Sequence, residues 1–414
     1  MIRRVFYVAG PGDVIRAHEH WSQNEQDPSE VSLTYSGQVE DFCRDLGARA
    51  YVVSYHQRKE VRRDGPFTLE HRPKPMPGAS GLWYYLAELW YGLGLLITAV
   101  RFRADLAVID SGHTFYFMTA LYRLFGIRVI PVLVNSLWPN GFPPTRPGPR
   151  LVLWLDSFFY RWVPEAILCI SPECARQVAQ LTSGRHRPLL RFNAQFLPEN
   201  FDKVPPPPPH DQRPFRVMYI GRVIRYKGVF DILEMARRIE AVAPGQVHWE
   251  LCGRGVDLEA LQARHQELGL EGVVTIRGWV ALAEVIEVYT RSHAAIVPTR
   301  SGFCEGLAMT AAEAVCAGRP VITNPVVPAL EMLTGAVVEA KTDDVDSHVE
   351  CVLKLASDAD EYDRLCRACA GLRGPFHDRS TGLTAVLKQA IDPQAPTAAL
   401  VRFDRIAKQS ESVL

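Results

Sequence analysis

Two glutamates stand eight positions apart around an apolar run in the C-terminal half of the chain. Glu305 and Glu313 enclose residues 306–312, which are glycine, leucine, alanine, methionine and threonine. At about 3.6 residues per turn, a helix over 306–317 would place both carboxylates on one face. Its N-terminus at Glu305 would suit an anion, because the first backbone N–H groups of a helix lack partners. The plain alternative is a pair of solvated acids on an ordinary surface helix.

A basic loop follows the strand expected at 216–220. Its residues 221–228 read GRVIRYKG and end where a helix is expected to begin. Arg222 and Lys227 would neutralise a diphosphate, the guanidinium as a planar fork and the ammonium as a point charge. A basic loop by itself is usually just solvated. This loop, however, leaves the same expected sheet as the segment that carries Glu305, and that placement favours anion binding.

Alternating strands and helices have to position these side chains. Short β-rich runs alternate with segments of helical periodicity, which predicts an α/β fold with parallel sheets. Ligands bind beyond the carboxyl ends of the strands in such sheets. Strands are expected at 4–9, 48–54, 106–110, 129–134 and 166–171, then at 216–220, 248–252, 273–277, 294–297, 320–323 and 336–339. Helices are expected at 37–46, 82–102, 114–125, 148–162, 172–181, 228–243, 257–268, 282–290, 306–317, 344–356 and within 360–392.

Five consecutive prolines, 205–209, divide the chain. Prolines in series form a stiff, extended connector, and 414 residues exceed the size at which a single core keeps growing. We therefore expect two Rossmann-like domains that face each other across a cleft. The N-terminal domain, at 1–204, would bind the acceptor, and the C-terminal domain, at 215–375, would bind the donor. A proline-rich linker at 205–214 would join them, and a helix and tail would follow at 376–414.

Composition narrows the classes of partner. The 46 basic and 46 acidic residues balance, which gives no argument for nucleic acid as a partner. The nine cysteines are odd in number and scattered, which suits a reducing, cytoplasmic compartment. Cys366 and Cys369 form a lone CxxC, interpreted as two thiols on one helix face rather than a metal or redox site. We expect no metal.

The segment 82–100 leaves three alternatives open. It is apolar and aromatic, and Glu88 is its only charged residue. A buried helix, a helix on a membrane surface and a membrane span all fit this length, although Arg101 and Arg103 follow at once. Arginines interleaved with aromatic residues near Trp154 also suit a bilayer surface. Contact of this region with the inner face of a membrane is therefore one expectation, and a plain core helix is the other.

With these motifs, the chain resembles the retaining glycosyltransferases of family GT4, also called glycosyl transferases group 1, which have the GT-B fold. The resemblance runs in order from residue 216 to about residue 340. It rests on Gly221-Arg222, Lys227-Gly228, Cys252-Gly253-Arg254-Gly255, Gly278-Trp279-Val280, Pro298-Thr299, the two glutamates and Gly318-Arg319-Pro320-Val321. The family usually has Glu-Gly-Phe-Gly at the first acid, whereas this chain has Leu307 and Ala308 after Glu305-Gly306. We expect this departure to affect sugar specificity more than catalysis.

The resemblance implies an enzyme that moves a sugar from a nucleotide-diphosphate donor to a glycan, lipid-linked or other hydroxyl acceptor, in polysaccharide or glycoconjugate synthesis. It implies retention of configuration and no metal ion or cofactor. Arg222 and Lys227 would hold the diphosphate, Glu313 would accept hydrogen bonds from the ribose and Glu305 would contact the donor sugar. The donor-binding set would be completed by Gly221, Gly253, Trp279, Val280, Gly306, Leu307, Ala308 and Met309.

The N-terminal half resembles the family only in layout. Gly10 and Gly12 stand where the family has its first glycine-rich loop, and with Asn135 they are expected on the acceptor side. His113 follows a strand end and is expected to join Glu305, Arg222 and Lys227 in catalysis. His18 and His20 are weaker acceptor-side candidates. A nucleotide-sugar epimerase of the same fold and a non-catalytic sugar-nucleotide-binding subunit remain as alternatives.

Overall fold

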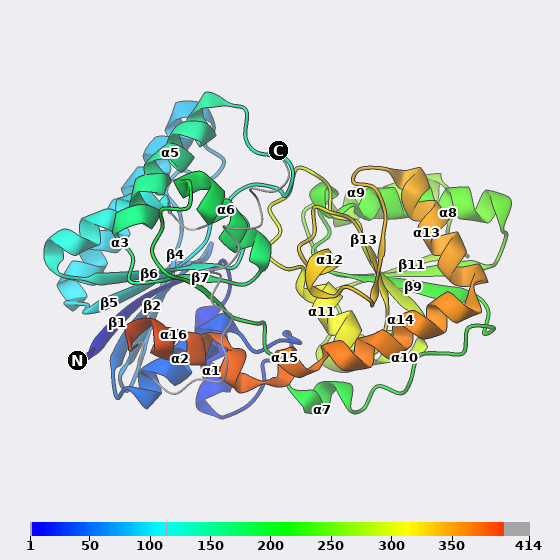
Figure 1. Cartoon of the computed structure of the whole chain (residues 1–414), viewed down its shortest axis with the longest axis horizontal. Helices are drawn as coiled ribbons and strands as arrows, with labels where there is room; N and C mark the ends of the chain where they lie inside the picture. The colour runs from blue at the N-terminus through cyan, green and yellow to red at the C-terminus, as the bar shows by residue number, and fades with distance from the viewer. Residues whose placement is uncertain (1, 113, 393–414) are drawn as a thin grey trace.

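The computed structural model describes residues 2–112 and 114–392. The first 191 residues supply an eight-stranded sheet with the order β3-β4-β2-β1-β5-β6-β7-β8 (Figure 1). Neighbouring strands run parallel except for β3, which pairs antiparallel with β4 at the edge. The strands are β1 (Arg4–Ala9), β2 (Arg49–Tyr55), β3 (Glu60–Asp64), β4 (Phe67–Arg72), β5 (Leu106–Asp110), β6 (Arg128–Leu133), β7 (Ile167–Cys169) and β8 (Leu189–Arg191).

Helices cover both faces of this sheet, which is why every residue of β5 is buried. In Figure 1, α3, α5 and α6 lie above the sheet and α1, α2 and α16 lie below it. The bounds are α1 (Val14–Ser22), α2 (Tyr35–Asp45), α3 (Gly81–Phe102), α4 (Tyr116–Thr119), η1 (Ala120–Phe125), α5 (Pro147–Trp162), α6 (Pro172–Thr182) and α7 (Pro198–Phe201). None of the helices in the described ranges combines the length and the hydropathy that a membrane crossing needs.

A second, wholly parallel sheet follows the proline run, with the order β11-β10-β9-β12-β13-β14. Its strands are β9 (Phe215–Ile220), β10 (Val247–Cys252), β11 (Val274–Gly278), β12 (Ala294–Val297), β13 (Val321–Thr323) and β14 (Val337–Glu339). The helices are η2 (Arg225–Lys227), α8 (Val229–Val242), α9 (Leu258–Glu267), α10 (Leu282–Arg291), α11 (Met309–Cys316), α12 (Ala329–Met332), α13 (Val345–Ser357) and α14 (Ala359–Leu372). The predicted α/β class with two parallel-sheet domains is confirmed.

The proline linker is held against the second sheet. Arg319 is fully buried and donates to the carbonyl oxygen of Pro205 at 2.8 Å and to that of Ser292 at 3.3 Å. The hydroxyl of Tyr362 donates to the carbonyl oxygen of Pro208 at 2.9 Å. The strands divide between the sheets on either side of this linker, and a domain boundary at 205–214 stays our proposal.

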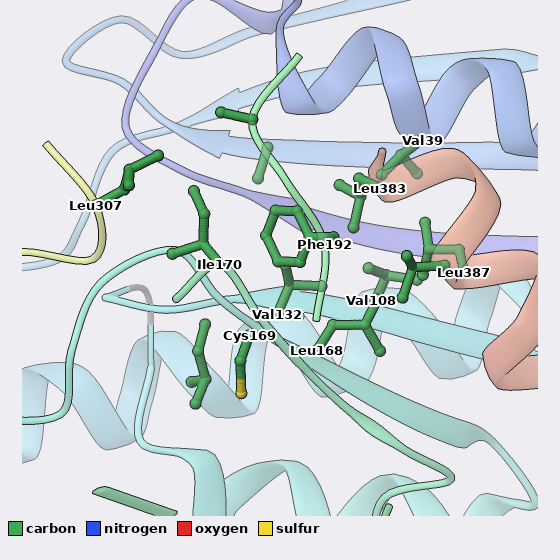
Figure 2. Close-up of a cluster of buried hydrophobic side chains, with 14 of the residues drawn as sticks. Val39, Val108, Val132, Leu168, Cys169, Ile170, Phe192, Leu307, Leu383 and Leu387 are labelled. Carbon is green, nitrogen blue, oxygen red and sulfur yellow. The ribbon is translucent and has the colours of Figure 1, made fainter. Parts of the chain in front are cut away.

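After α14 the chain crosses back to the first sheet through α15 (Gly374–His377), η3 (Arg379–Thr381) and α16 (Leu383–Ile391) (Figure 1). The helix α16 packs on α2, where the backbone N–H of Leu383 donates to Oε1 of Gln38 at 2.9 Å. Figure 2 shows Leu383 and Leu387 beside Val39 in the apolar core. The predicted tail after residue 392 lies outside the described residues.

Candidate active site

The helix that follows Glu305 is shorter than the sequence predicts. Helix α11 begins at Met309, so Glu305 lies in the preceding loop, and the prediction that both glutamates share one helix face is wrong. Contacts made by the loop explain the difference. A Cβ on Gly306 would lie only 1.9 Å from the carbonyl oxygen of Val134, so this backbone is pressed against the N-terminal domain. Ala308 then adopts a positive φ of 68°, which the right-handed helix cannot include.

Glu305 is held from two sides at the carboxyl edge of the second sheet. The residue is 5% exposed; Oε1 accepts a hydrogen bond from Oγ1 of Thr299 at 2.8 Å and pairs with Nζ of Lys227. Both side chains of the ion pair are largely buried, which strengthens their attraction. No described residue forms a hydrogen bond with the other oxygen, Oε2, so that oxygen remains available to a ligand.

The two cations predicted to bind phosphate, Lys227 and Arg222, both lie close to the aromatic ring of Phe303. Nζ of Lys227 lies 4.6 Å and Cζ of Arg222 lies 5.1 Å from the ring centroid of Phe303. The negative face of the ring stabilises both cations and keeps them close together, where two like charges would otherwise repel each other. Phe303 is not among the site residues that the sequence predicts. Its place two residues before Glu305 was the only available signal.

Glycines allow the strand ends beside these cations to approach closely. Gly253 has a φ of 148°, and a Cβ there would lie 1.7 Å from the carbonyl oxygen of Gly221. The backbone N–H of Gly221 donates to the carbonyl oxygen of Cys252 at 3.0 Å. A larger residue at 253 would therefore push the basic loop out of place.

Glu313 lies inside α11 and is 7% exposed. Burial raises the pKa of its carboxyl to about 7, and the negative charge of Glu30 adds to the rise. The hydroxyl of Tyr289, which donates to Oε2 at 3.3 Å, opposes the rise. Glu30 belongs to the N-terminal domain, so a side chain from each domain acts on this carboxylate.

The remaining donor-side residues follow neighbouring strands. Trp279 comes directly after β11 and is 49% exposed, whereas Val280 is buried in the same apolar cluster as Leu307 and Ala308. Met309 contacts the N-terminal domain, because the hydroxyl of Tyr35 lies 3.7 Å from its Sδ. The exposed indole of Trp279 is therefore available to a ligand, while Leu307 and Ala308 have mainly packing roles.

Acceptor-side predictions fall at the facing edge of the first sheet. Gly10 lies near the carboxyl of Asp110, which accepts a hydrogen bond from the hydroxyl of Tyr7 at 2.6 Å and whose pKa burial raises to about 7. Gly12 has open space around its Cα, and Asn135 lies against Gly306 with its backbone N–H donating to Oγ of Ser111 at 3.0 Å. Asn135 is thus the acceptor-side residue nearest to the Glu305 loop in these contacts.

The predicted histidines have different outcomes. His113 lies outside the described residues, so the structure does not place it. The ring of His18 is buried, with Nδ1 2.9 Å from Glu40 and Nε2 3.4 Å from Asp64. Both of its nitrogens are therefore occupied by carboxylates of its own domain. His20 lies 3.8 Å from Glu25 at the end of α1.

Comparison with known proteins agrees with this geometry. Residues 200–369 match the family model of glycosyl transferases group 1. The matched range contains every C-terminal motif residue named above, so the predicted resemblance to group 1 is confirmed for that part of the chain. The match does not extend to residues 1–199. A comparison with curated proteins gave no match.

Solved structures of similar fold cover nearly the whole chain. Sucrose-phosphate synthase from Thermosynechococcus elongatus has a TM-score of 0.70 at 13% identity and covers 95% of this chain and 98% of its own. A trehalose-phosphate synthase (UDP-forming) from Burkholderia vietnamiensis has a TM-score of 0.67 at 14% identity over 94% and 99%. Anabaena HepE in complex with UDP and glucose has a TM-score of 0.62 at 14% identity over 94% and 98%. These similarities establish the GT-B fold of both domains.

Proposed function

We propose that this chain is a retaining glycosyltransferase of family GT4 that moves a sugar from a nucleotide-diphosphate donor to a hydroxyl group of a glycan, lipid-linked or other acceptor, in polysaccharide or glycoconjugate synthesis. The observation that carries the proposal is the cluster that Arg222 and Lys227 form with Glu305 and the ring of Phe303, while the buried Glu313 follows in α11. The cluster lies within the residues that match the group 1 model. Because HepE was solved with UDP and glucose, a uridine nucleotide is the first donor to test.

In this proposal the two cations stabilise the leaving group. The bond between the anomeric carbon and the diphosphate oxygen breaks with its electron pair, and Arg222 and Lys227 balance the charge that develops. The acceptor oxygen bonds to the anomeric carbon on the face that the diphosphate leaves, which retains the configuration. Its proton passes to the departing diphosphate. These steps draw on cations of the chain itself and include no metal ion or other cofactor.

Glu305 would divide its two oxygens between the protein and the sugar. Oε1 already binds Lys227 and Thr299, whereas Oε2 would accept a hydrogen bond from a hydroxyl of the donor sugar. The ammonium of Lys227 has three N–H donors, so its contact with Glu305 leaves others for the diphosphate. The pair thus fixes the sugar and the diphosphate relative to each other. Ionised Glu313 would accept hydrogen bonds from the ribose.

The test is an assay of nucleoside diphosphate release with UDP-glucose, UDP-galactose and GDP-mannose against a panel of hydroxyl acceptors, in the presence of EDTA. NMR of the product would report the anomeric configuration. We expect Lys227→Ala to lower kcat/KM by about 100-fold or more. The control Lys354→Ala, on the exposed surface of α13, should match the wild type. Wild-type rates in Lys227→Ala would contradict the assigned role.

The alternatives give different results in the same assay. An epimerase would isomerise the donor without any acceptor. A non-catalytic binding subunit would bind UDP with no transfer or hydrolysis, and Lys227→Ala and Glu305→Ala would weaken that binding. Loss of transfer in His113→Ala with donor binding intact would support a catalytic His113, and an unchanged rate would refute it.

A further inference from the structure

The outer surface of the N-terminal domain exposes many large apolar side chains on neighbouring helices. Helices α3 and α5 lie on the same side of the eight-stranded sheet, away from the C-terminal domain (Figure 1). Trp83 and Trp90 of α3 are 65% and 70% exposed, and Trp162 of α5 is 73% exposed. The surface, here named the α3–α5 face, consists of Leu82, Trp83, Tyr84, Leu86, Trp90, Leu93, Ile97, Leu121, Leu124, Phe125, Leu151, Trp154, Phe158 and Trp162.

Packing on the sheet does not account for these side chains. Helix α3 already buries Ala87, Tyr91, Leu95 and Ala99, one stripe at four-residue spacing, and a helix that only covers a sheet carries polar residues on its other side. Single exposed apolar residues are ordinary, whereas a contiguous patch marks an interaction surface.

The helices form one continuous surface. A Cβ on Gly148, at the start of α5, would lie 2.2 Å from the hydroxyl of Tyr85 on α3, so the two helices meet there without a gap. The 3-10 helix η1 packs against α3 and contributes Leu124 and Phe125. The rings of Trp154 and Phe158 pack edge to face with centroids 4.8 Å apart, so part of the patch is already ordered.

The charges of α3 and α5 that have no ion-pair partner among the described residues have one sign. The acids of α3 and α5 are buried: Glu88 pairs with Lys74 at 2.8 Å, and Asp156 accepts from the backbone N–H of Phe117 at 2.7 Å. The arginines of the same helices form no ion pair with any residue in the described ranges; they are Arg101, Arg150 and Arg161. Aromatic side chains with unpaired cations are the combination that suits a surface of anionic lipids.

A groove on the same face places two of these cations beside apolar walls. It has a volume of about 370 Å³ and is lined by Arg150 and Arg161 together with Leu153, Trp154 and Leu181. Nε of Arg161 is buried without a hydrogen-bond partner among the described residues. A phosphate at this position would satisfy that donor, while the apolar walls would contact hydrocarbon.

We propose that the α3–α5 face docks on a bilayer that contains anionic phospholipids. Tryptophans 83, 90 and 162 enter the interfacial region, and Arg150 and Arg161 bind lipid phosphates. A second copy of the chain is a poorer occupant, because a twofold interface would place the same unpaired arginines opposite each other. The proposal concerns the surface alone and holds whether or not the chain transfers sugar.

Vesicle flotation of the full chain tests the proposal. Vesicles of phosphatidylcholine with and without phosphatidylglycerol are the probes, and we expect stronger binding to those with phosphatidylglycerol. Trp83→Ser/Trp90→Ser should lower the partition coefficient by about tenfold or more, because interfacial aromatic contact is lost. Arg150→Gln/Arg161→Gln should remove the preference for phosphatidylglycerol, at about fivefold for each charge.

A matched control removes two charges elsewhere. Arg264→Gln/Arg367→Gln, on α9 and α14 of the C-terminal domain, should float with the vesicles as the wild type does. Circular dichroism and melting temperature establish that each variant is folded. Absence of wild-type binding, or equal binding by the wild type and both α3–α5 variants, would overturn the proposal. A dimer that Trp83→Ser/Trp90→Ser dissociates, without vesicle binding, would overturn it in favour of self-association.

Discussion

Replacing Glu313 by glutamine should separate the stability of the fold from donor binding. Glu313 is 7% exposed, and burial raises the pKa of its carboxyl from 4.5 to about 7. The folded chain therefore keeps a proton that the unfolded chain releases between these pH values, and its stability falls as the pH rises through that window. At about 1.36 kcal/mol per pKa unit, the loss is about 3 kcal/mol above pH 7.

Glutamine keeps the shape of the side chain, accepts a hydrogen bond from Tyr289 and never ionises. We expect Glu313→Gln to be more stable than the wild type by about 3 kcal/mol at pH 8 and by less than about 1 kcal/mol at pH 5. Urea unfolding at both pH values measures this difference. A variant that is less stable than the wild type at pH 8, or equally shifted at both pH values, would refute the reasoning.

The affinity for the donor should rise with pH, whereas the stability of the fold falls. Ionised Glu313 accepts hydrogen bonds from the ribose in our proposal, so the affinity of the wild type for UDP-glucose should fall about tenfold per pH unit below 7. Glu313→Gln should bind about 10- to 100-fold more weakly at pH 8 and show a flat profile, since hydrogen bonds to a charged group are lost. Isothermal titration calorimetry measures both. Parallel profiles for the two proteins would remove Glu313 from the ribose site.

Glu30→Gln is the matched control for this experiment. It removes a negative charge that raises the pKa of Glu313 but leaves Glu313 itself in place. The midpoints of the stability profile and of the binding profile should both move to lower pH, while affinity at pH 8 is retained. An unchanged midpoint would show that burial alone sets the pKa.

Three further substitutions test single contacts. Gly253→Ala places a Cβ 1.7 Å from a carbonyl oxygen of Gly221, so the melting temperature should fall with a loss of more than about 2 kcal/mol, and a wild-type value would refute the clash. Arg319→Met leaves the carbonyl of Pro205 without its donor, so urea unfolding should show a loss of about 3 kcal/mol, and an unaltered midpoint would contradict this. Ala308→Gly relieves a φ of 68° and should stabilise the chain by up to about 1 kcal/mol in the same assay, whereas a loss would show that the methyl group matters more.

The C-terminal sheet could be predicted from the sequence, whereas part of the N-terminal sheet could not. All six C-terminal strands were expected within one residue of their bounds, because each is a short apolar run followed by a helical period. Strand β3 was missed since all five of its residues are exposed and four are charged. Strand β8 has only three residues, and the sequence pattern gives such a strand little signal.

The start of α11 was predicted wrongly for a different reason. Leu307 and Ala308 favour a helix by their local propensity, and the apolar pattern continues through them. Contacts from far along the chain decide otherwise: Lys227 and Thr299 hold Glu305, and Val134 closes on Gly306. Local patterns carry no information about partners 78 or 172 positions away. The contacts of Arg222 and Lys227 with Phe303 could not be predicted for the same reason.

The loop before α11 links the donor cluster to the other domain. Leu307 is 2% exposed and lies in the apolar cluster that contains Ile170 and Phe192 (Figure 2). Figure 2 shows its side chain directed toward Ile170, so Leu307 packs against the N-terminal domain. Gly306 lies against Val134 of the N-terminal domain, and the adjoining Glu305 pairs with Lys227 of the C-terminal domain, so this short loop makes contacts with both domains. We therefore expect that Leu307 and Ala308, which replace the family's usual pair, affect the position of Glu305 through the packing of this loop between the domains.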